Sequence, residues 1–558
     1  MSAPRPKAPV LSLGGAALVL LTVVALILLS APRAIPPAIA EIAPQAVKQI
    51  EEPPPEQQTE LDNAPDGKEG RSDGGTSGGD GGPGNGEPDS GSNGSRSAPG
   101  QASGPNLSNC VGNPPRQTED PQSPPCVPFW EGNNGGATSR GVTADSIRIG
   151  VPSGQTTFAP LLQHFNARYT FYGRKLVAVP LDFGESINSA DPLNQCPPEL
   201  QQNHANAAYD AEVFGATMYY CFQGYAFYKK AAEKKIVAVE SWGGSYIEPE
   251  LASLHPYLWQ YSMAVDRQLE VVADWMCSRW QGTAQYAGPG LTGQQRTPAV
   301  VMINQRQDAL DTRAFERALA ACGLPLAVAP KRVETQAQMT AATLDFKAND
   351  VTTVLCLCIA PGAGDLARTA TSQGYFPEWL YPSFQRMDSN EPFRTPGVQG
   401  PDDDQAQRAF GLAFRPRQIV PAADPAWQAY AEFAPVGPVD VQRMEQIRGM
   451  YEGLLVLASG IQLAGPQLTP ERFAAALQST VFPNPEHPIR PGHVGFPGRS
   501  HSMTVDAVEW YFDTVAKTPY SNTRPGSLCY LDGGARRGLG GFARALFQRS
   551  PTCDSGAR

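Results

Sequence analysis

The sequence lacks the motifs that mark the common enzyme classes. No GxSxG elbow follows a predicted strand, and there is no HExxH motif, no Walker loop and no SxxK pair. The six histidines include no close pair of the kind that fills a metal site. We therefore expect no enzyme activity and no cofactor.

Positive charge is also scarce. The 558 residues carry 44 lysines and arginines against 54 aspartates and glutamates, a net charge of −10. A nucleic-acid-binding protein needs a basic face, so this class is not supported. Two remaining clusters fail as metal sites. The run Asp402–Asp404 follows Pro401 and is interpreted as an exposed turn, and His487, His493 and His501 match no zinc spacing.

An uncharged apolar run, Val10–Ala31, opens the chain. At about 1.5 Å rise per residue it is long enough to cross the hydrocarbon core of a membrane. Arg5 and Lys7 precede the run and only Arg33 lies just beyond it, which predicts a cytoplasmic N-terminus and an exported remainder. We interpret residues 1–31 as a membrane anchor. The alternative is a signal segment that is cleaved near Ala38–Ala40.

Residues 32–141 are predicted to be a disordered linker rich in proline, glycine and serine. The stretch Gly75–Ser97 contains no apolar residue that could start a core. Such a spacer lets a folded head stand away from a surface. Near its end, Cys110 and Cys126 are close enough in sequence to form a local disulfide.

The folded part, residues 142–525, is predicted to be an α/β structure. It opens on Val142–Gly154, where Ile147, Ile149 and Val151 alternate like the buried face of a strand. Strand, polar loop and helix then repeat at the spacing of a parallel sheet, in two series separated by an extended crossing near 258–264. Further strands are predicted at 176–181, 213–220, 236–239, 299–303, 352–358 and 379–382, and helices at 158–172, 225–235, 265–280, 311–322, 365–373, 444–462 and 468–477.

Several short motifs resemble those of type I periplasmic binding proteins, the solute-binding components of branched-chain amino-acid-type ABC importers. They include the opening strand Gly141–Gly154, the step Tyr172–Leu176 (YGRKL), Ala367–Pro377 (ARTATSQGYFP) and the late helix around Tyr451–Leu454 (YEGL). The resemblance covers about residues 143–520.

That resemblance implies two Rossmann-like, doubly wound lobes, joined by three crossovers, that close about a hinge on a ligand. Lobe 1 would comprise about 142–262 and 386–465, and lobe 2 about 263–385 and 466–525. Residues 526–558 are left as a C-terminal tail with no assigned role.

The same resemblance implies ligand contacts at the C-terminal ends of the strands, where side chains and backbone amides hold a carboxylate and an amine. The matching positions are Ser153, Gln155 and Thr156; Cys221, Phe222 and Gln223; Ser241, Trp242 and Gly243; and Asn304, Gln305 and Arg306, with Ser383 and Gln385 as further candidates. The family's Ser/Thr pair after the fourth strand is only partly present, as Ser241-Trp242, which weakens the inference to an amino-acid ligand.

The ten cysteines are even in number, which predicts disulfides in an exported chain. The expected pairs are Cys110–Cys126, Cys196–Cys221, Cys277–Cys322 and Cys529–Cys553. Cys356 and Cys358 face the same way on one strand, with Cα atoms about 6.6 Å apart, at the outer limit for a bridge. We predict that they do not pair with each other; one of them could reach Cys277 or Cys322 instead.

The sequence thus predicts a monomeric, extracytoplasmic solute-binding protein. It would capture a small polar molecule (an amino acid, an amide or a small acid) between its lobes for an ABC permease. It would be held at the membrane by the N-terminal helix, or be secreted after signal cleavage. Two alternatives stay open: a tethered ligand sensor without transport, and a structural protein of the cell envelope.

Overall fold

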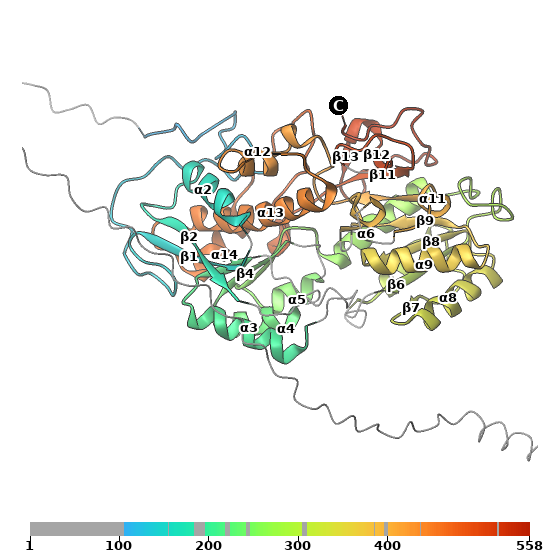
Figure 1. Ribbon diagram of the computed structural model, residues 1–558, viewed down its shortest axis with the longest axis horizontal. Helices are drawn as coiled ribbons and strands as arrows, with labels where there is room; N and C mark the ends of the chain where they lie inside the picture. The colour runs from blue at the N-terminus through green and yellow to red at the C-terminus, as the bar shows by residue number, and fades with distance from the viewer. Residues whose placement is uncertain are drawn as a thin grey trace, which may run out of the picture. The chain divides into compact units, whose positions relative to one another are not determined.

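The computed structural model describes residues 105–154, 156–182, 196–217, 224–241, 246–303, 310–383, 386–394, 400–435, 437–521 and 524–557. These residues form two α/β lobes, each built on its own sheet (Figure 1). The predicted anchor and the linker up to residue 104 lie outside the described residues. Among the helices of the described ranges, none combines the length and the apolarity that a membrane crossing requires.

Lobe 1 contains a five-stranded parallel sheet in the order β2-β1-β3-β4-β5. The predicted alternation of the opening strand is confirmed, because Ile147, Ile149 and Val151 are all buried. Its elements are β1 (Ser146–Pro152), α2 (Phe158–Arg168), β2 (Lys175–Leu181), α3 (Pro198–Asp210), β3 (Gly215–Thr217), α4 (Tyr225–Glu233), β4 (Val237–Glu240), α5 (Glu248–Ser253) and β5 (Leu258–Gln260).

Lobe 2 contains a mixed sheet in the order β12-β11-β10-β9-β8-β6-β7. Its strands from β6 to β10 are parallel, whereas β11 runs antiparallel to β10, and β12 and β13 run antiparallel to β11. The elements are α6 (Val265–Arg279), β6 (Pro298–Ile303), α7 (Arg313–Ala321), β7 (Lys331–Arg332), α8 (Gln336–Ala348), β8 (Thr353–Cys358), α9 (Ala360–Ser372), β9 (Glu378–Tyr381), α10 (Glu391–Arg394), α11 (Asp403–Ala406), β10 (Ala409–Ala413), β11 (Ala507–Asp513), β12 (Ser527–Tyr530) and β13 (Arg536–Arg537).

The chain passes between the lobes three times, as the resemblance implied. The crossings are residues 261–264, 414–424 and 504–506, and lobe 1 receives α12 (Pro425–Ala431), α13 (Val441–Ala464) and α14 (Pro470–Ser479) between the second and the third. The lobe boundaries differ from the expected ones in two places. Residues 386–413 belong to lobe 2, because β10 pairs with β9. Residues 466–503 belong to lobe 1, because Phe473 and Leu477 pack in the core of its sheet.

The predicted tail is part of lobe 2. It contributes β12 and β13 to the sheet, and Phe547 is buried against Trp280 and Phe410. The strands of this segment are only two to four residues long, and the packing partners of Phe547 lie far away in the chain, which is why composition alone made this segment resemble a tail.

The end of the predicted linker is also folded. Residues 105–141 pack on lobe 1, where Gln117 and Ser123 are fully buried. Arg174 donates to the carbonyl oxygens of Asn134 and Gly136, and Thr138 donates to that of Leu468. The proline-rich composition suggested disorder, but here backbone carbonyls are satisfied by side chains of the lobe instead of by regular secondary structure.

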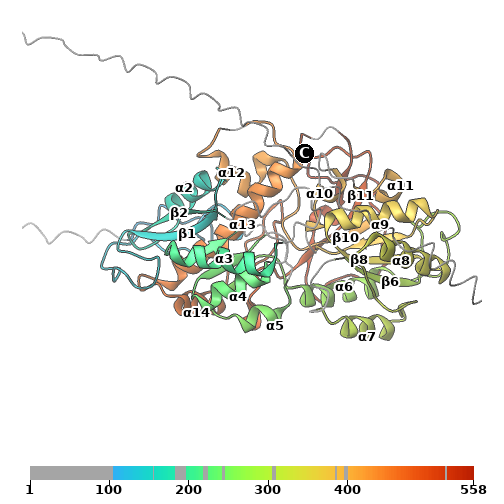
Figure 2. The same cartoon turned by 60° about the horizontal axis from the view of Figure 1, so that its bottom comes forward.

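Helix α13 is the central helix of lobe 1. It begins at Val441, where the side chain of the N-cap residue Asp440 accepts from the backbone N–H of Arg443, and it ends at Gly465, whose φ of 79° few other residues tolerate. Nearly all of its residues are buried, as expected for a helix enclosed on every side. It packs against β3, β4 and β5, and α2, α12 and α13 lie side by side in both views (Figure 1, Figure 2).

Three of the expected disulfides are confirmed: Cys110–Cys126, Cys277–Cys322 and Cys529–Cys553. The fourth expected pair, Cys196–Cys221, stays a prediction, because Cys221 lies outside the described residues. One prediction was wrong, since Cys356 and Cys358 are bonded to each other with Cα atoms 5.2 Å apart. The local geometry of β8 brings these two Cα atoms closer than the spacing of an ideal strand and within the usual range for a disulfide.

Candidate functional site

Each sheet contains a point where the winding of the chain reverses. In lobe 1, β2 and β3 lie on opposite sides of β1, and in lobe 2, β7 and β8 lie on opposite sides of β6. Ligands of open parallel sheets bind outside the carboxyl ends of the strands at such switch points. The ends concerned are those of β1 and β3 in lobe 1 and those of β6 and β8 in lobe 2.

Helix α2 begins at the switch point of lobe 1 without a side-chain cap. Its N-cap residue, Thr157, makes no capping hydrogen bond, and its first turn contains no acidic residue. Thr157 is fully buried, and its Oγ1 has no hydrogen-bond partner in the part of the chain that the structure describes. The first N–H groups of a helix lack partners within the helix and carry a partial positive charge. This end of α2 is therefore suited to a carboxylate.

Ser241, directly after β4, is a second buried hydroxyl at the same edge of the sheet. Its Oγ also lacks a partner among the described residues. A Cβ added at Gly453 of α13 would overlap Thr217 Oγ1 and come within 2.8 Å of Ser241 Oγ. Glycine at this position thus allows α13 to approach the ends of β3 and β4 closely, and Ser241 faces that helix.

The other predicted positions are distributed as follows. Ser153 and Thr156 are exposed beside the start of α2, at the expected edge. Ser383, just beyond β9 in lobe 2, is buried, and its hydroxyl donates to Asp388. The remaining positions lie outside the described residues: Gln155, Cys221, Phe222, Gln223, Trp242, Gly243, Asn304, Gln305, Arg306 and Gln385.

Sequence reasoning missed a group of buried charges where α13 meets lobe 2. Arg415, in the second crossing, donates to both carboxylate oxygens of Glu452 at 3.1 and 3.2 Å and to Glu445 Oε2 at 3.0 Å. We call this group the buried charge network; it consists of Arg386, Asp388, Glu391, Arg415, Asp424, Glu445, Arg448 and Glu452. Its five carboxyl groups outnumber its three guanidinium groups. The members are scattered along the chain and share no motif, so no local signal reveals them.

Burial and the neighbouring arginines shift the pKa values of the two central glutamates in opposite directions. Burial raises the pKa of Glu452 to about 7, although the Arg415 guanidinium opposes the shift. Burial also acts to raise the pKa of Glu445, but Arg415, Arg386 and Arg448 together hold it well below its usual value. Glu452 is thus the member of the pair that takes up a proton near neutral pH.

We expect Glu452 to make the protein less stable as the pH rises from about 5 to 7. Its folded-state pKa lies above the unfolded one, so the folded state holds the extra proton over this window and loses that advantage as the pH increases. Glu452→Gln mimics the protonated side chain and should remove this contribution, which amounts to about 1 kcal/mol per pH unit at its steepest. Chemical unfolding at several pH values measures it.

Glu445→Gln is the matched control, because Glu445 lies on the same helix and contacts the same Arg415. Its pKa is depressed, so its ionised form stabilises the fold throughout the neutral range and is lost only in acid. This variant should be less stable at every pH between 5 and 7. Because Glu445 contributes to the raised pKa of Glu452, its slope should be somewhat smaller than that of the wild type but should not vanish. Identical slopes in the wild type and in Glu452→Gln would contradict the assignment.

Comparison with known proteins gives structural similarity alone. No protein-family model matches the chain, and no curated protein matches its sequence. Among solved structures, a solute-binding protein of an ABC transporter from R. palustris, in complex with 4-hydroxybenzoate, has 14% identity and a TM-score of 0.48, covering 68% of this chain and 96% of its own.

Two further structures are similar to this chain to about the same degree. A fatty acid ABC transporter substrate-binding protein from Thermomonospora curvata has 16% identity and a TM-score of 0.46, covering 70% of this chain and 94% of its own. A branched-chain amino acid transporter substrate-binding protein from Streptococcus pneumoniae, in complex with isoleucine, has 13% identity and a TM-score of 0.45, covering 69% and 100%.

Proposed function

We propose that the protein is an extracytoplasmic solute-binding protein that takes a small carboxylate-bearing molecule at the switch points of its lobes. The observation that carries this proposal is the uncapped start of α2, where the buried Thr157 hydroxyl has no partner among the described residues. A buried donor left without a partner costs free energy. A bound carboxylate would satisfy both this hydroxyl and the free N–H groups of the first turn.

Lobe 2 contains a helix N-terminus that likewise lacks a side-chain cap. Helix α9 starts at the end of β8, its N-cap residue Ile359 has no side chain able to cap it, and its first turn contains no acidic residue. With one such end in each lobe and three crossings between the lobes, a ligand held at both ends would favour the closed arrangement. Amino acids, amides and small acids are the candidate ligands.

A thermal-shift screen of the full chain tests this proposal. A ligand at about 100 times its dissociation constant stabilises a protein by about 2.7 kcal/mol, which for the roughly 410 residues that the structure describes raises the melting temperature by roughly 3 °C. We expect at least one amino acid, amide or small carboxylic acid to give a saturable shift of this size. The methyl ester of that acid is the matched control and should give none. A broad panel without a single saturable shift would count against ligand binding.

Delivery to an ABC permease is the role we propose for the bound form, with the chain held at the membrane by residues 1–31 or released by cleavage. Co-purification from membranes that contain the candidate permease, with and without the ligand, tests this step. A ligand that binds but never promotes association with a permease would favour the sensor instead.

A further inference from the structure

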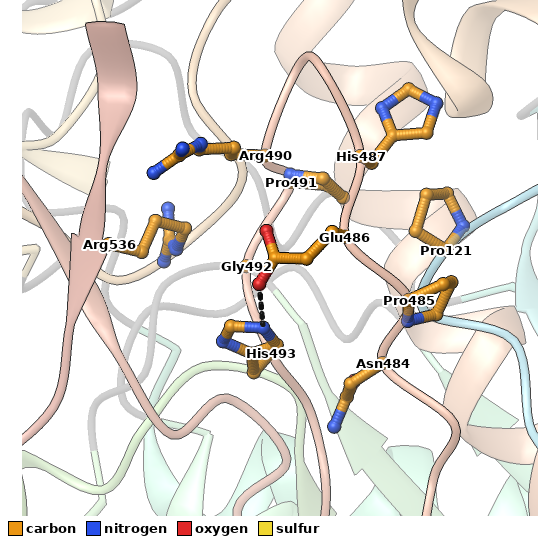
Figure 3. Close-up of a pocket in the computed structure, with 10 residues that line it drawn as sticks. All are labelled: Pro121, Asn484, Pro485, Glu486, His487, Arg490, Pro491, Gly492, His493 and Arg536. Carbon is orange, nitrogen blue, oxygen red and sulfur yellow. Dashed lines mark ion pairs between the residues drawn. The ribbon is translucent and has the colours of Figure 1, made fainter.

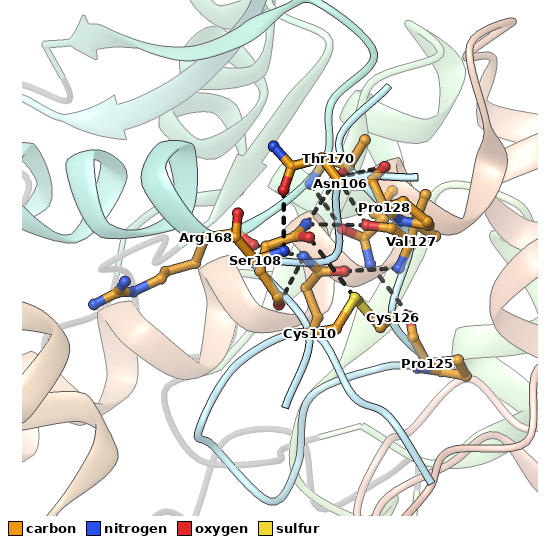
Figure 4. The surroundings of a disulfide bond; sticks show 12 residues. Asn106, Ser108, Cys110, Pro125, Cys126, Val127, Pro128, Arg168 and Thr170 are labelled. Carbon is orange, nitrogen blue, oxygen red and sulfur yellow. Dashed lines mark hydrogen bonds between the residues drawn. A yellow bond between two sulfur atoms is a disulfide. The ribbon is translucent and has the colours of Figure 1, made fainter. Parts of the chain in front are cut away.

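The disulfide Cys110–Cys126 closes a loop of residues 110–126, which we call the clamp loop (Figure 4). The base of this loop is fixed to lobe 1. Gln117 Nε2 donates to the carbonyl oxygen of Arg168 at 2.6 Å, and its Oε1 accepts from the backbone N–H of Val127. The loop is therefore attached to the end of α2 and cannot move away from the lobe without breaking buried hydrogen bonds.

The tip of the clamp loop reaches the first crossing. Tyr261, the first residue after β5, donates its hydroxyl to Gln122 Oε1 at 2.6 Å. Gln122 Nε2 donates in turn to the carbonyl oxygens of Pro491 and Gly492, at 3.3 and 3.1 Å. Both polar atoms of one side chain thus join the first crossing to the segment that leads toward the third.

That segment continues into the third crossing. His493 Nδ1 lies 2.7 Å from Asp506 Oδ2, and Asp506 Oδ1 accepts from Arg536 Nε of β13 at 2.8 Å. Arg536 also donates to the carbonyl oxygens of Phe414 and Arg415, at 2.9 and 3.1 Å, and so joins the third crossing to the second. Figure 3 shows Arg536 and His493 around one pocket with Pro121 of the clamp loop.

Helix α13 also links the clamp loop to the second crossing. Tyr451 donates its hydroxyl to Asp120 Oδ2 of the clamp loop at 2.6 Å, and the next residue, Glu452, binds Arg415 of the second crossing. Asp120 and Tyr451 are both buried. The clamp loop therefore contacts the first crossing directly through Tyr261, and it is linked to the second and third crossings through Tyr451–Glu452 and through the segment at Pro491–His493.

We propose that the clamp loop restrains the hinge and so sets how readily the two lobes rotate relative to each other. Rotation of this kind requires backbone torsions to change in the crossings. Such changes displace Tyr261, whereas the carbonyl groups of Pro491 and Gly492, which belong to lobe 1, hold the side chain of Gln122 in place. The disulfide shortens the loop, which prevents it from following Tyr261. Each rotation then breaks this buried hydrogen bond, and the loop raises its free-energy cost.

Hydrogen exchange of the full-length protein without ligand tests the clamp, so the result does not depend on the proposed ligand. The backbone N–H of Thr504 donates to the carbonyl oxygen of Tyr261 and that of Met263 to Thr504 Oγ1, so exchange of these amides reports opening of the hinge. Gln122→Ala removes the hydrogen bond of the clamp loop to Tyr261 and should speed exchange in peptides from the crossings by about tenfold. Peptides from β6 should be unchanged.

Asn134→Ala is the matched control. Asn134 lies on the same N-terminal segment and donates to the carbonyl oxygens of Ala144 and Tyr172, away from the crossings. It should leave exchange in the crossings at the wild-type rate. If Gln122→Ala destabilises the whole fold, Tyr261→Phe is used instead. It removes the same hydrogen bond by deleting its donor, the Tyr261 hydroxyl. Wild-type exchange in the crossings of Tyr261→Phe would overturn the proposal and leave the loop as a surface cover.

Discussion

Replacement of Arg415 by methionine is expected to lower the free energy of unfolding by about 3–5 kcal/mol, because it leaves buried carboxylates without their main cation. The side chain of Arg415 is 4% exposed and contacts both Glu445 and Glu452. Burial alone would lower the pKa of Arg415, but Glu452, Glu445 and Asp388 raise it well above its usual value, so the group is charged at every accessible pH. Equilibrium unfolding in guanidinium measures the loss.

The expected loss depends on pH in a way that identifies its cause. Without Arg415, Glu452 should take up a proton more readily, so the variant should recover part of its stability at pH 5. The double variant Arg415→Met/Glu452→Gln should be more stable at neutral pH than Arg415→Met alone, since it removes the uncompensated charge.

Arg313→Met is the control for removal of an arginine from an ion pair. The pair Arg313–Asp311 is largely exposed, and water replaces it readily, so this variant should unfold like the wild type. If Arg415→Met also unfolds like the wild type, the buried charge network does not hold α13 against the second crossing.

Substitution of Thr157 by aspartate is expected to weaken binding of a carboxylate ligand by about 100-fold, because like charges brought together in a buried site cost several kcal/mol. Aspartate is close to threonine in size and favours the start of a helix. It would place its own carboxylate at the N–H groups of the first turn of α2, which are free of side-chain caps. Isothermal titration with the acid that gives the largest thermal shift measures the affinity.

Thr157→Asn is the matched control, since asparagine also suits the N-cap position but has no charge. We expect its affinity to stay within a few-fold of the wild type. The melting temperature of each variant without ligand measures what the substitution itself costs, since Thr157 is fully buried. Equal affinities for the aspartate and asparagine variants would place the ligand carboxylate elsewhere, and the screen would still stand as evidence of binding.

Several local features of the protein could be predicted from the sequence. The alternation Ile147–Ile149–Val151 gave a buried strand, because the side-chain period of a strand is visible in the sequence itself. The short separation of Cys110 and Cys126 in the sequence made their disulfide plausible. Helix α14 begins as predicted, with the side chain of Thr469 accepting from the backbone N–H of Arg472. The two lobes follow from the repetition of strand, loop and helix.

The failures have a common physical origin. Residues 386–413 and 466–503 were assigned to the wrong lobes. The lobe of each segment depends on which distant strand or core it packs against, and hydrophobic periodicity does not encode that partner. The Cys356–Cys358 bond depends on a local Cα separation of 5.2 Å within β8, which the spacing of an ideal strand does not predict. Of the predicted site residues within the described ranges, Ser153 and Thr156 lie at the expected edge of lobe 1, whereas Ser241 faces Gly453 of α13.

The sequence by itself therefore determined the class of fold and the first strand, which rest on short-range spacing and repetition, and it also allowed three disulfides to be paired. Only the tertiary structure decided that residues 105–141 form part of lobe 1, that the buried charge network assembles on α13, and that the clamp loop reaches the crossings. These features join residues that lie from 37 to 331 positions apart. Their energies arise from burial and pairing, which exist only once the chain has brought those residues together.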